Sequence, residues 1–285
     1  MVDYSQSPPT GLARRRRRLS DRETEERMLR AAVAMVNRSG LTVSLDHISF
    51  EDIIRDANVS RSAVYRRWPY KDLFFSDFVI ELAEHATPTI INDEEELMKR
   101  VVAEHEDWLG TPELRHNLVV ELLRQLALLD FETMYESAGW RTYVALHATF
   151  MSLADGEIRD QVQASLAHSE QVRTIRVAKA WEQLAGLFGY RLRPELGATF
   201  ETMATLLSAT LHGLVIMALS TLDIATQRIE ANPFGAARKD EWSLPAIGLA
   251  AIATAFLEPD PAIEWNDAKL ASVRQALSSW ALPNA

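Results

Sequence analysis

A pair of short helices joined by a tight turn, predicted between Ser49 and Trp68, restricts the fold more than any other feature. Ser49 with Asp52, and then Ser60, have the pattern of helix N-termini, because a Ser side chain there accepts a bond from an unpaired backbone N–H. Asn58 lies in the turn, where a residue that tolerates positive φ is needed. Such a pair can present its second helix to the major groove of DNA.

Another helix is predicted upstream of this pair. Ser20 and Glu23 have the spacing of a capping box, and Ser39-Gly40 is typical of a helix end. Most of the chain beyond shows helical spacing of apolar residues and hardly any strand-like alternation. Among the helices expected there are ones over about 112–129 and 131–153, with a break at Asp130, and a long one over about 194–224. We therefore predict an all-α fold: an N-terminal three-helix helix-turn-helix DNA-binding domain, then a larger C-terminal helical domain.

The charge is divided unevenly along the chain. The net charge is −10, but residues 1–75 carry 14 Lys and Arg against 10 Asp and Glu, so the remaining residues hold all of the excess acid. A small basic module joined to a large acidic one fits a DNA-binding protein whose second domain does not bind DNA. We expect a disordered basic arm over 1–19, the DNA-binding domain over 20–75, and the larger helical domain over 76–285.

Several classes of protein are disfavoured by what the sequence lacks. There is no cysteine, which excludes disulfides and thiolate chemistry, and the seven histidines show no compact metal-ligand spacing. Catalytic and phosphate-binding glycine motifs are missing as well. We expect no enzyme, no metal site and no cofactor. We also expect a cytoplasmic protein, with the apolar run 206–222 as a buried helix rather than a membrane span.

The second helix of the pair divides by face. Val64 and Trp68, four residues apart, are expected to pack inward. Other faces carry side chains that can bond to bases or phosphates, namely Arg61, Ser62, Tyr65 and Arg66.

The stretch from Ile53 to Leu73 resembles the TetR family of bacterial transcriptional regulators in its turn, recognition helix, aromatic-rich ending and following helix start. Asn58 replaces the Gly that is usual there. The resemblance implies a phosphate contact at Ser49, another at Lys71, and groove or backbone contacts by the recognition helix. It also implies that the helical domain over 76–285 is a regulatory, ligand-binding and dimerisation domain. The DNA-binding residues predicted in this domain are Ser49, Ser60, Arg61, Ser62, Ala63, Tyr65, Arg66 and Lys71.

Five consecutive arginines, Arg14 to Arg18, precede the first helix. A short basic arm of this kind can enter the minor groove or lie along phosphates. A solvated charge run, or a patch for other anionic surfaces, is the alternative. We favour DNA, with contacts by Arg15, Arg16, Arg17 and Arg18.

Two further hypotheses concern the C-terminal domain. The aromatic and Met residues of its central helices can line an apolar effector pocket, or can be plain core. The pocket candidates are Trp108, Met134, Trp140, Tyr143, Phe150 and Trp181. Residues 203–222 are apolar on nearly all faces, which indicates burial. The resemblance to the TetR family makes this helix a candidate for dimerisation, and burial in its own core is the alternative. The acidic clusters 93–96 and 104–107 are interpreted as solvated faces.

The sequence thus predicts a homodimeric transcriptional regulator that binds a near-palindromic double-stranded DNA operator. A repressor relieved by an unknown small-molecule effector is the favoured form, without membrane association. The alternative is a helical protein that binds a small molecule or a protein partner and not DNA.

Overall fold

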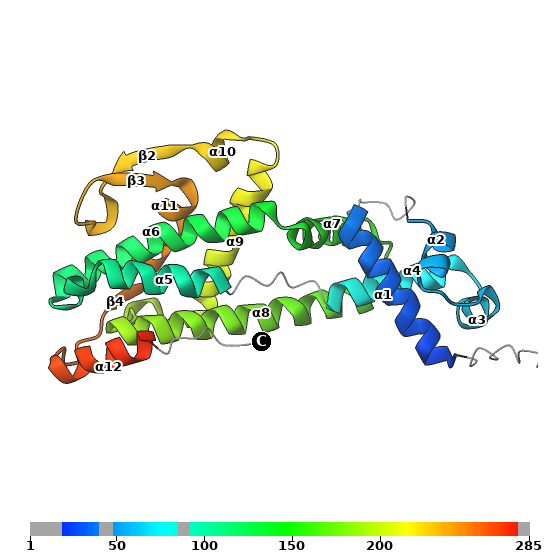
Figure 1. Cartoon of the computed structure of the whole chain (residues 1–285), viewed down its shortest axis with the longest axis horizontal. Helices are drawn as coiled ribbons and strands as arrows, with labels where there is room; N and C mark the ends of the chain where they lie inside the picture. Colours follow the sequence, from blue (N-terminus) through cyan, green and yellow to red (C-terminus); the bar gives the residue numbers. More distant parts are fainter. Residues whose placement is uncertain (1–18, 40–47, 85–91, 279–285) are drawn as a thin grey trace, which may run out of the picture. The chain divides into compact units, whose positions relative to one another are not determined.

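Helices make up nearly all of the regular structure in the computed structural model, which describes residues 19–39, 48–84 and 92–278 (Figure 1). The fold is all-α, as predicted. The chain forms two compact units, Met1–Glu81 and Leu82–Ala285.

Four helices form the first unit, and three of them begin where the sequence places capping residues. They are α1 Asp21–Ser39, α2 Phe50–Asp56, α3 Arg61–Arg67 and α4 Lys71–Glu84, whose last residues pass into the second unit. The capping box before α1 is confirmed: Ser20 N–H donates to Glu23 Oε2 at 2.8 Å, and Glu23 N–H donates to Ser20 Oγ at 3.1 Å. Ser49 accepts from Asp52 N–H at 3.2 Å to start α2.

The core of the first unit forms around aromatic side chains from the end of α3 and from α4. Trp68, Phe74 and Phe78 are fully buried, and the Trp68 and Phe74 rings meet edge-on with centroids 5.1 Å apart. Each such side chain contributes roughly 1.5–3 kcal/mol on burial. Val64 of α3 and Met28 of α1 are also fully buried, so all the helices meet at one small core.

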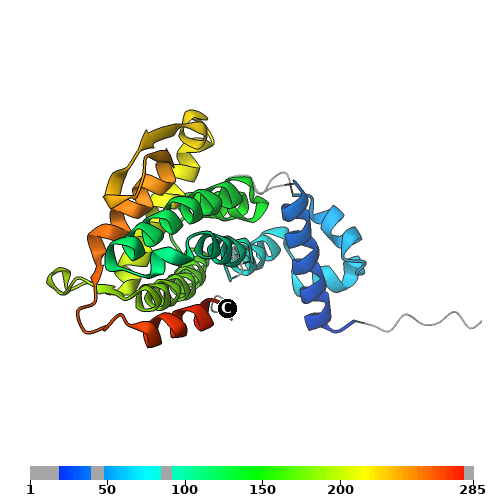
Figure 2. The ribbon, with the colours of Figure 1, turned by 60° about the vertical axis from the view of Figure 1, so that its left-hand side comes forward.

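The second unit is larger and consists of packed helices with a few short strands. Its α-helices are α5 Asn92–Glu104, α6 Pro112–Glu136, α7 Ala138–Ser152, α8 Glu157–Phe188, α9 Phe200–Ala218, α10 Asp223–Thr226, α11 Leu244–Phe256 and α12 Asp267–Ser278. Helix α5 lies along α6 in Figure 1, and α11 (orange) packs against α6 and α9 in Figure 2. Short 3₁₀ turns occupy Glu106–Leu109, Pro194–Leu196 and Pro233–Gly235.

Two predicted helix boundaries in this unit are wrong. The sequence predicts a break at Asp130, but α6 continues to Glu136 because Ala127, Phe131 and Met134 keep a buried helical spacing. The break falls at Ser137, whose Oγ caps α7 by accepting from Trp140 N–H at 3.2 Å. The long helix expected from Pro194 onward begins only at Phe200, because Gly197 has a left-handed φ of 55°.

The short strands, which the sequence does not predict, form two antiparallel pairs. Strand β1 (Tyr190–Leu192) pairs with β4 (Leu257–Pro259), and β2 (Arg228–Ala231) pairs with β3 (Asp240–Ser243). Each has only three or four residues, too few to show an alternating pattern.

Helix α9 has one buried face and one exposed apolar face. Met203, Leu207 and Val215 are buried in the core of the second unit, whereas Leu206 and Ile216 are exposed. The helix is also long and apolar enough to cross a membrane by length and composition, and 28% of that segment is buried. A core helix passes the same test, and α9 packs against α8 and α11 on its buried side.

Candidate nucleic-acid interface

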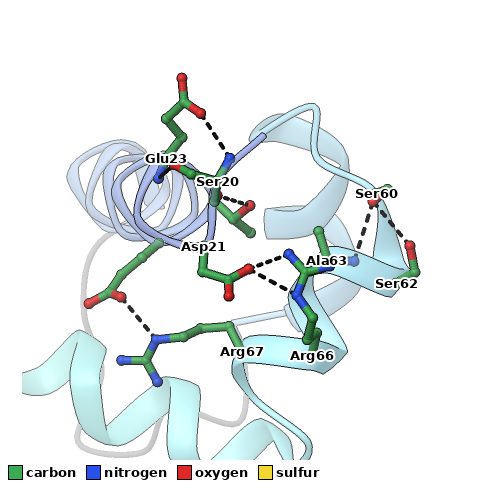
Figure 3. Close-up of polar contacts among 10 residues, drawn as sticks. Ser20, Asp21, Glu23, Ser60, Ser62, Ala63, Arg66 and Arg67 are labelled. Atoms are coloured by element: carbon green, nitrogen blue, oxygen red, sulfur yellow. Dashed lines mark hydrogen bonds and ion pairs between the residues drawn. The ribbon is translucent and has the colours of Figure 1, made fainter. Parts of the chain in front are cut away.

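The N-terminus of α3 is fixed by the turn that precedes it. Asn58 has a positive φ of 52°, as the sequence predicts. Ser60 then caps the helix, because its Oγ accepts from Ala63 N–H at 3.3 Å. The Ser60 hydroxyl also lies 3.3 Å from that of Ser62 (Figure 3). Local bonds therefore fix the start of α3.

The two faces of α3 separate as expected. Val64 and Trp68 are fully buried against the other helices of the first unit. The other side carries the exposed side chains of Arg61, Ser62, Tyr65 and Arg66, which we call the α3 outer face. This face therefore presents two guanidinium groups and two hydroxyls from a single helix.

Three of the four side chains on the α3 outer face contact carboxylates of the same unit. Arg61 Nη2 lies 2.6 Å from Glu51 Oε2, and Tyr65 donates to Glu51 Oε1 at 3.4 Å. Arg66 is paired with Asp21 at the start of α1, with Nε at 2.9 Å from Oδ1 (Figure 3). These carboxylates neutralise the face while no DNA is bound, and any phosphate contact must compete with them.

Arg67, which is not among the predicted DNA-binding residues, connects three helices. Its Nε donates to Glu25 of α1 at 2.9 Å, and its Nη2 donates to Asp77 of α4 at 3.0 Å. The same Asp77 oxygen accepts from the buried indole N–H of Trp68 at 2.8 Å. The hydrogen bond to Glu25 raises the pKa of Arg67. Arg67 therefore positions α3 rather than extending its outer face.

The remaining predicted DNA-binding residues lie in different surroundings. Ser49 is half-buried and serves as the cap of α2. Ala63 is buried, so its side chain does not share the α3 outer face. Lys71 is exposed at the first residue of α4. The arm residues Arg15, Arg16, Arg17 and Arg18 lie outside the described residues.

Only some of the predicted pocket residues meet at one cavity. Met134 and Trp181 line a cavity of about 200 Å³ in the second unit. Trp140 and Tyr143 adjoin it through His212, a lining residue whose ring centroid lies 6.0 Å and 5.7 Å from theirs.

The other two pocket candidates lie away from this cavity. Trp108 stacks on His105 with ring centroids 4.1 Å apart and borders a separate space of about 10 Å³. The Phe150 ring faces the guanidinium of Arg159 at 4.6 Å.

The interpretation of the first acidic cluster as a solvated face is wrong for Glu94. This residue is half-buried and lines the cavity of about 200 Å³ together with Asp130 of α6. Burial, followed by the charge of Glu94 and a hydrogen bond with it, raises the pKa of Asp130 well above its usual value. Within the described ranges, no group of three or more His, Cys, Asp or Glu side chains could hold a metal ion.

Comparison with known proteins finds similarity to solved structures. One is a TetR-family transcriptional regulator from Agrobacterium tumefaciens, with 16% identity over 70% of this chain and 90% of that chain at a TM-score of 0.39. Another is a putative TetR-family transcriptional regulator from Mesorhizobium loti, with 15% identity over 92% of this chain and 99% of that chain at a TM-score of 0.40. The chain is similar to TetR-family regulators. No sequence-family model and no curated protein matches it.

Proposed function

We propose that the protein is a sequence-specific DNA-binding transcriptional regulator of the TetR type. The observation that carries this proposal is the α3 outer face, with two arginines, a tyrosine and a serine on a helix whose opposite side is fully buried. Arg can donate two bonds to guanine in the major groove, and hydroxyls can bond to phosphates. We also propose that Lys71 and the arm Arg15–Arg18 add phosphate contacts, and that the protein acts in the cytoplasm, where a bacterial operator lies.

Purified protein titrated into labelled duplex from its own upstream region tests this proposal. We expect salt-sensitive binding, and we expect Arg61→Ala to weaken it by about 1–3 kcal/mol because a base contact is removed. Arg274→Ala is the matched control, because this exposed arginine is paired with Glu106 in the second unit at 2.8 Å. No binding in low salt would favour the alternative, a helical small-molecule or partner-binding protein. An equal loss of affinity in both variants would show that α3 does not read DNA.

We further propose that two copies associate through the exposed side of α9, so that each offers one α3 to one half of a near-palindromic operator. Leu206, Ile216 and Met217 are 44–54% exposed on this side. A Cβ built at Gly213 meets nothing within 4 Å, which leaves room for the close approach of a helix from a second copy. Light scattering should give a dimer for the wild type and a monomer for Ile216→Asp, with unchanged helical circular dichroism. A wild-type monomer at micromolar concentration would contradict this.

Repression relieved by an effector is the form of regulation that we propose. An effector that binds one conformation of the second unit more tightly than another would change the fraction of dimers in which both α3 helices match the operator. Such a shift requires that the effector's affinities for the two conformations differ. The cavity of about 200 Å³ is where we expect it to bind. Expression from the upstream promoter in cells with and without the gene tests the sign of regulation: higher expression without the gene supports repression.

A further inference from the structure

Two cavities in the second unit lie end to end. The larger has a volume of about 200 Å³ and the smaller about 50 Å³. They share four wall residues, Leu123, Leu126, Trp181 and Leu184. The two cavities therefore adjoin each other between α6 and α8, and we call them together the α6–α8 space.

The polar groups of this space are concentrated in the larger cavity, away from the shared wall. Along α6 the wall runs from Val119 in the smaller cavity to Asp130 in the larger, and along α8 it runs from Phe188 back to Arg173. Apart from Tyr190, the smaller cavity is lined by apolar side chains. The polar end consists of Glu94, Asp130, Arg173, Arg176, Ser208 and His212. The space thus suits a molecule with a long apolar part and one polar end.

Two buried polar atoms at the polar end have no hydrogen-bond partner among the described residues: Asp130 Oδ1 and Arg173 Nε. The rest of the Arg173 guanidinium is occupied, because Nη1 donates to Ser208 Oγ at 3.0 Å and Nη2 pairs with Glu170. Arg176 is half-buried on the cavity wall and has no carboxylate within ion-pair distance in the described part of the chain. A ligand could therefore donate a hydrogen bond to Asp130 Oδ1 and accept one from Arg173 Nε or from Arg176. Leaving such groups unpaired in a dry site is costly.

The charges at this end nearly balance. Burial raises the pKa of Asp130 well above its usual value and so favours its neutral form, and Glu94 and Arg176 on the same cavity wall carry opposite charges. Arg173 is offset by Glu170. Burial lowers the pKa of His212 to about 4, so its ring is neutral at pH 7. A charged head group would bring an uncompensated charge into this balanced site, whereas a neutral one would not.

We propose that this space binds an uncharged amphiphile, a straight alkyl chain ending in a primary amide or a hydroxyl. Its head donates a hydrogen bond to Asp130 Oδ1 and accepts one from Arg173 Nε or from Arg176. Its tail lies past Leu126 and Trp181 into the smaller cavity. The identification of this molecule as the effector rests on the proposed function, but its binding does not.

Calorimetric titration of the full-length protein with three straight-chain probes of ten carbon atoms each tests the head group. The probes are decanamide, decylamine and decanoate, each below its micelle concentration and without DNA. We expect decanamide to bind at least about tenfold more tightly than the two charged probes, since each of those leaves a buried group unpaired or a charge uncompensated. Tighter binding of decylamine or decanoate, or no binding of any probe, would overturn the proposal.

Substitutions at Asp130 separate its hydrogen bond from its charge. Asp130→Asn keeps an acceptor oxygen and should change decanamide affinity by less than about threefold, whereas Asp130→Leu removes the acceptor and should weaken it about tenfold. Glu136→Gln is the control, because Glu136 is exposed on the same helix. A tenfold loss with Asp130→Asn would show that the carboxyl charge matters and would overturn the neutral head group.

The smaller cavity supplies a test that is independent of the polar end. Val119 lines this cavity and not the larger one. Val119→Phe should therefore weaken decanamide several-fold and leave hexanamide unchanged, and an equal effect on both would refute the tail's position. Decanamide binding by a protein that fails to bind DNA would support the site while refuting the proposed function. DNA binding without decanamide binding would support the proposed function while refuting the site.

Discussion

Replacing Glu51 by Gln should strengthen binding to DNA of any sequence. Glu51 contacts two members of the α3 outer face, Arg61 at 2.6 Å and Tyr65 at 3.4 Å. Both partners of the ion pair are largely exposed, with 72% and 48% of their side-chain surfaces accessible, so the pair contributes about 0.2–1 kcal/mol. In a dimer two pairs must be exchanged for phosphate or base contacts. The substitution should then tighten binding by about 0.4–2 kcal/mol, or roughly 2- to 30-fold.

Fluorescence anisotropy with a labelled random-sequence duplex, measured from low to moderate salt, gives this number directly. The steepness of the salt dependence should rise by up to about one unit for every additional phosphate that the protein neutralises. Glu136→Gln removes the same charge from the second unit and should leave affinity nearly unchanged. Weaker binding of Glu51→Gln to random duplex would refute the competition between Glu51 and DNA. Weaker binding to the operator alone would instead show that Glu51 accepts from a cytosine amino group.

Two other perturbations test the packing of each unit. Asp77→Ala leaves the buried Trp68 indole N–H without its acceptor and removes one partner of Arg67. The free energy of unfolding of the first unit, measured by urea denaturation, should therefore fall by about 1–3 kcal/mol. An unchanged urea midpoint would contradict this. Burial lowers the pKa of His212 from 6.5 to about 4. Between pH 6.5 and pH 4 the unfolded chain therefore takes up a proton at this ring that the folded protein does not, so stability is complete above pH 6.5 and falls as the pH drops to 4. The stability difference between wild type and His212→Gln should therefore shift against the wild type by about 3 kcal/mol across that window, and a constant difference would mean that His212 titrates normally.

The first unit could be predicted well because its helix starts depend on local contacts. Ser20 bonds to a residue three positions away, as do Ser49 and Ser60, so sequence spacing alone reveals each cap. The ion pairs on the α3 outer face could not be foreseen in the same way. Asp21 is 45 residues from Arg66, and only the packing of α1 against α3 brings them together.

The cavity was harder to predict because its polar groups resemble ordinary surface charges in the sequence. Glu94 belongs to an acidic run that suits a helix start, and Asp130 stands where the sequence predicts a helix end. Their proximity depends on how α5 packs on α6. Aromatic residues were a poor guide, since Trp108 and Phe150 have other neighbours, whereas aliphatic and small side chains make up most of the wall.

The positions of Trp68 and Trp181 give the protein two natural spectroscopic reporters. Trp68 is the one tryptophan between residues 1 and 81, and it is buried at the end of α3, whereas Trp181 borders both cavities. In protein labelled with 5-fluorotryptophan, each of the seven tryptophans gives its own ¹⁹F resonance, and Phe substitutions at 68 and 181 assign these two. If the protein regulates as proposed, the order of DNA release and ligand entry can then be followed in one sample, without any attached dye.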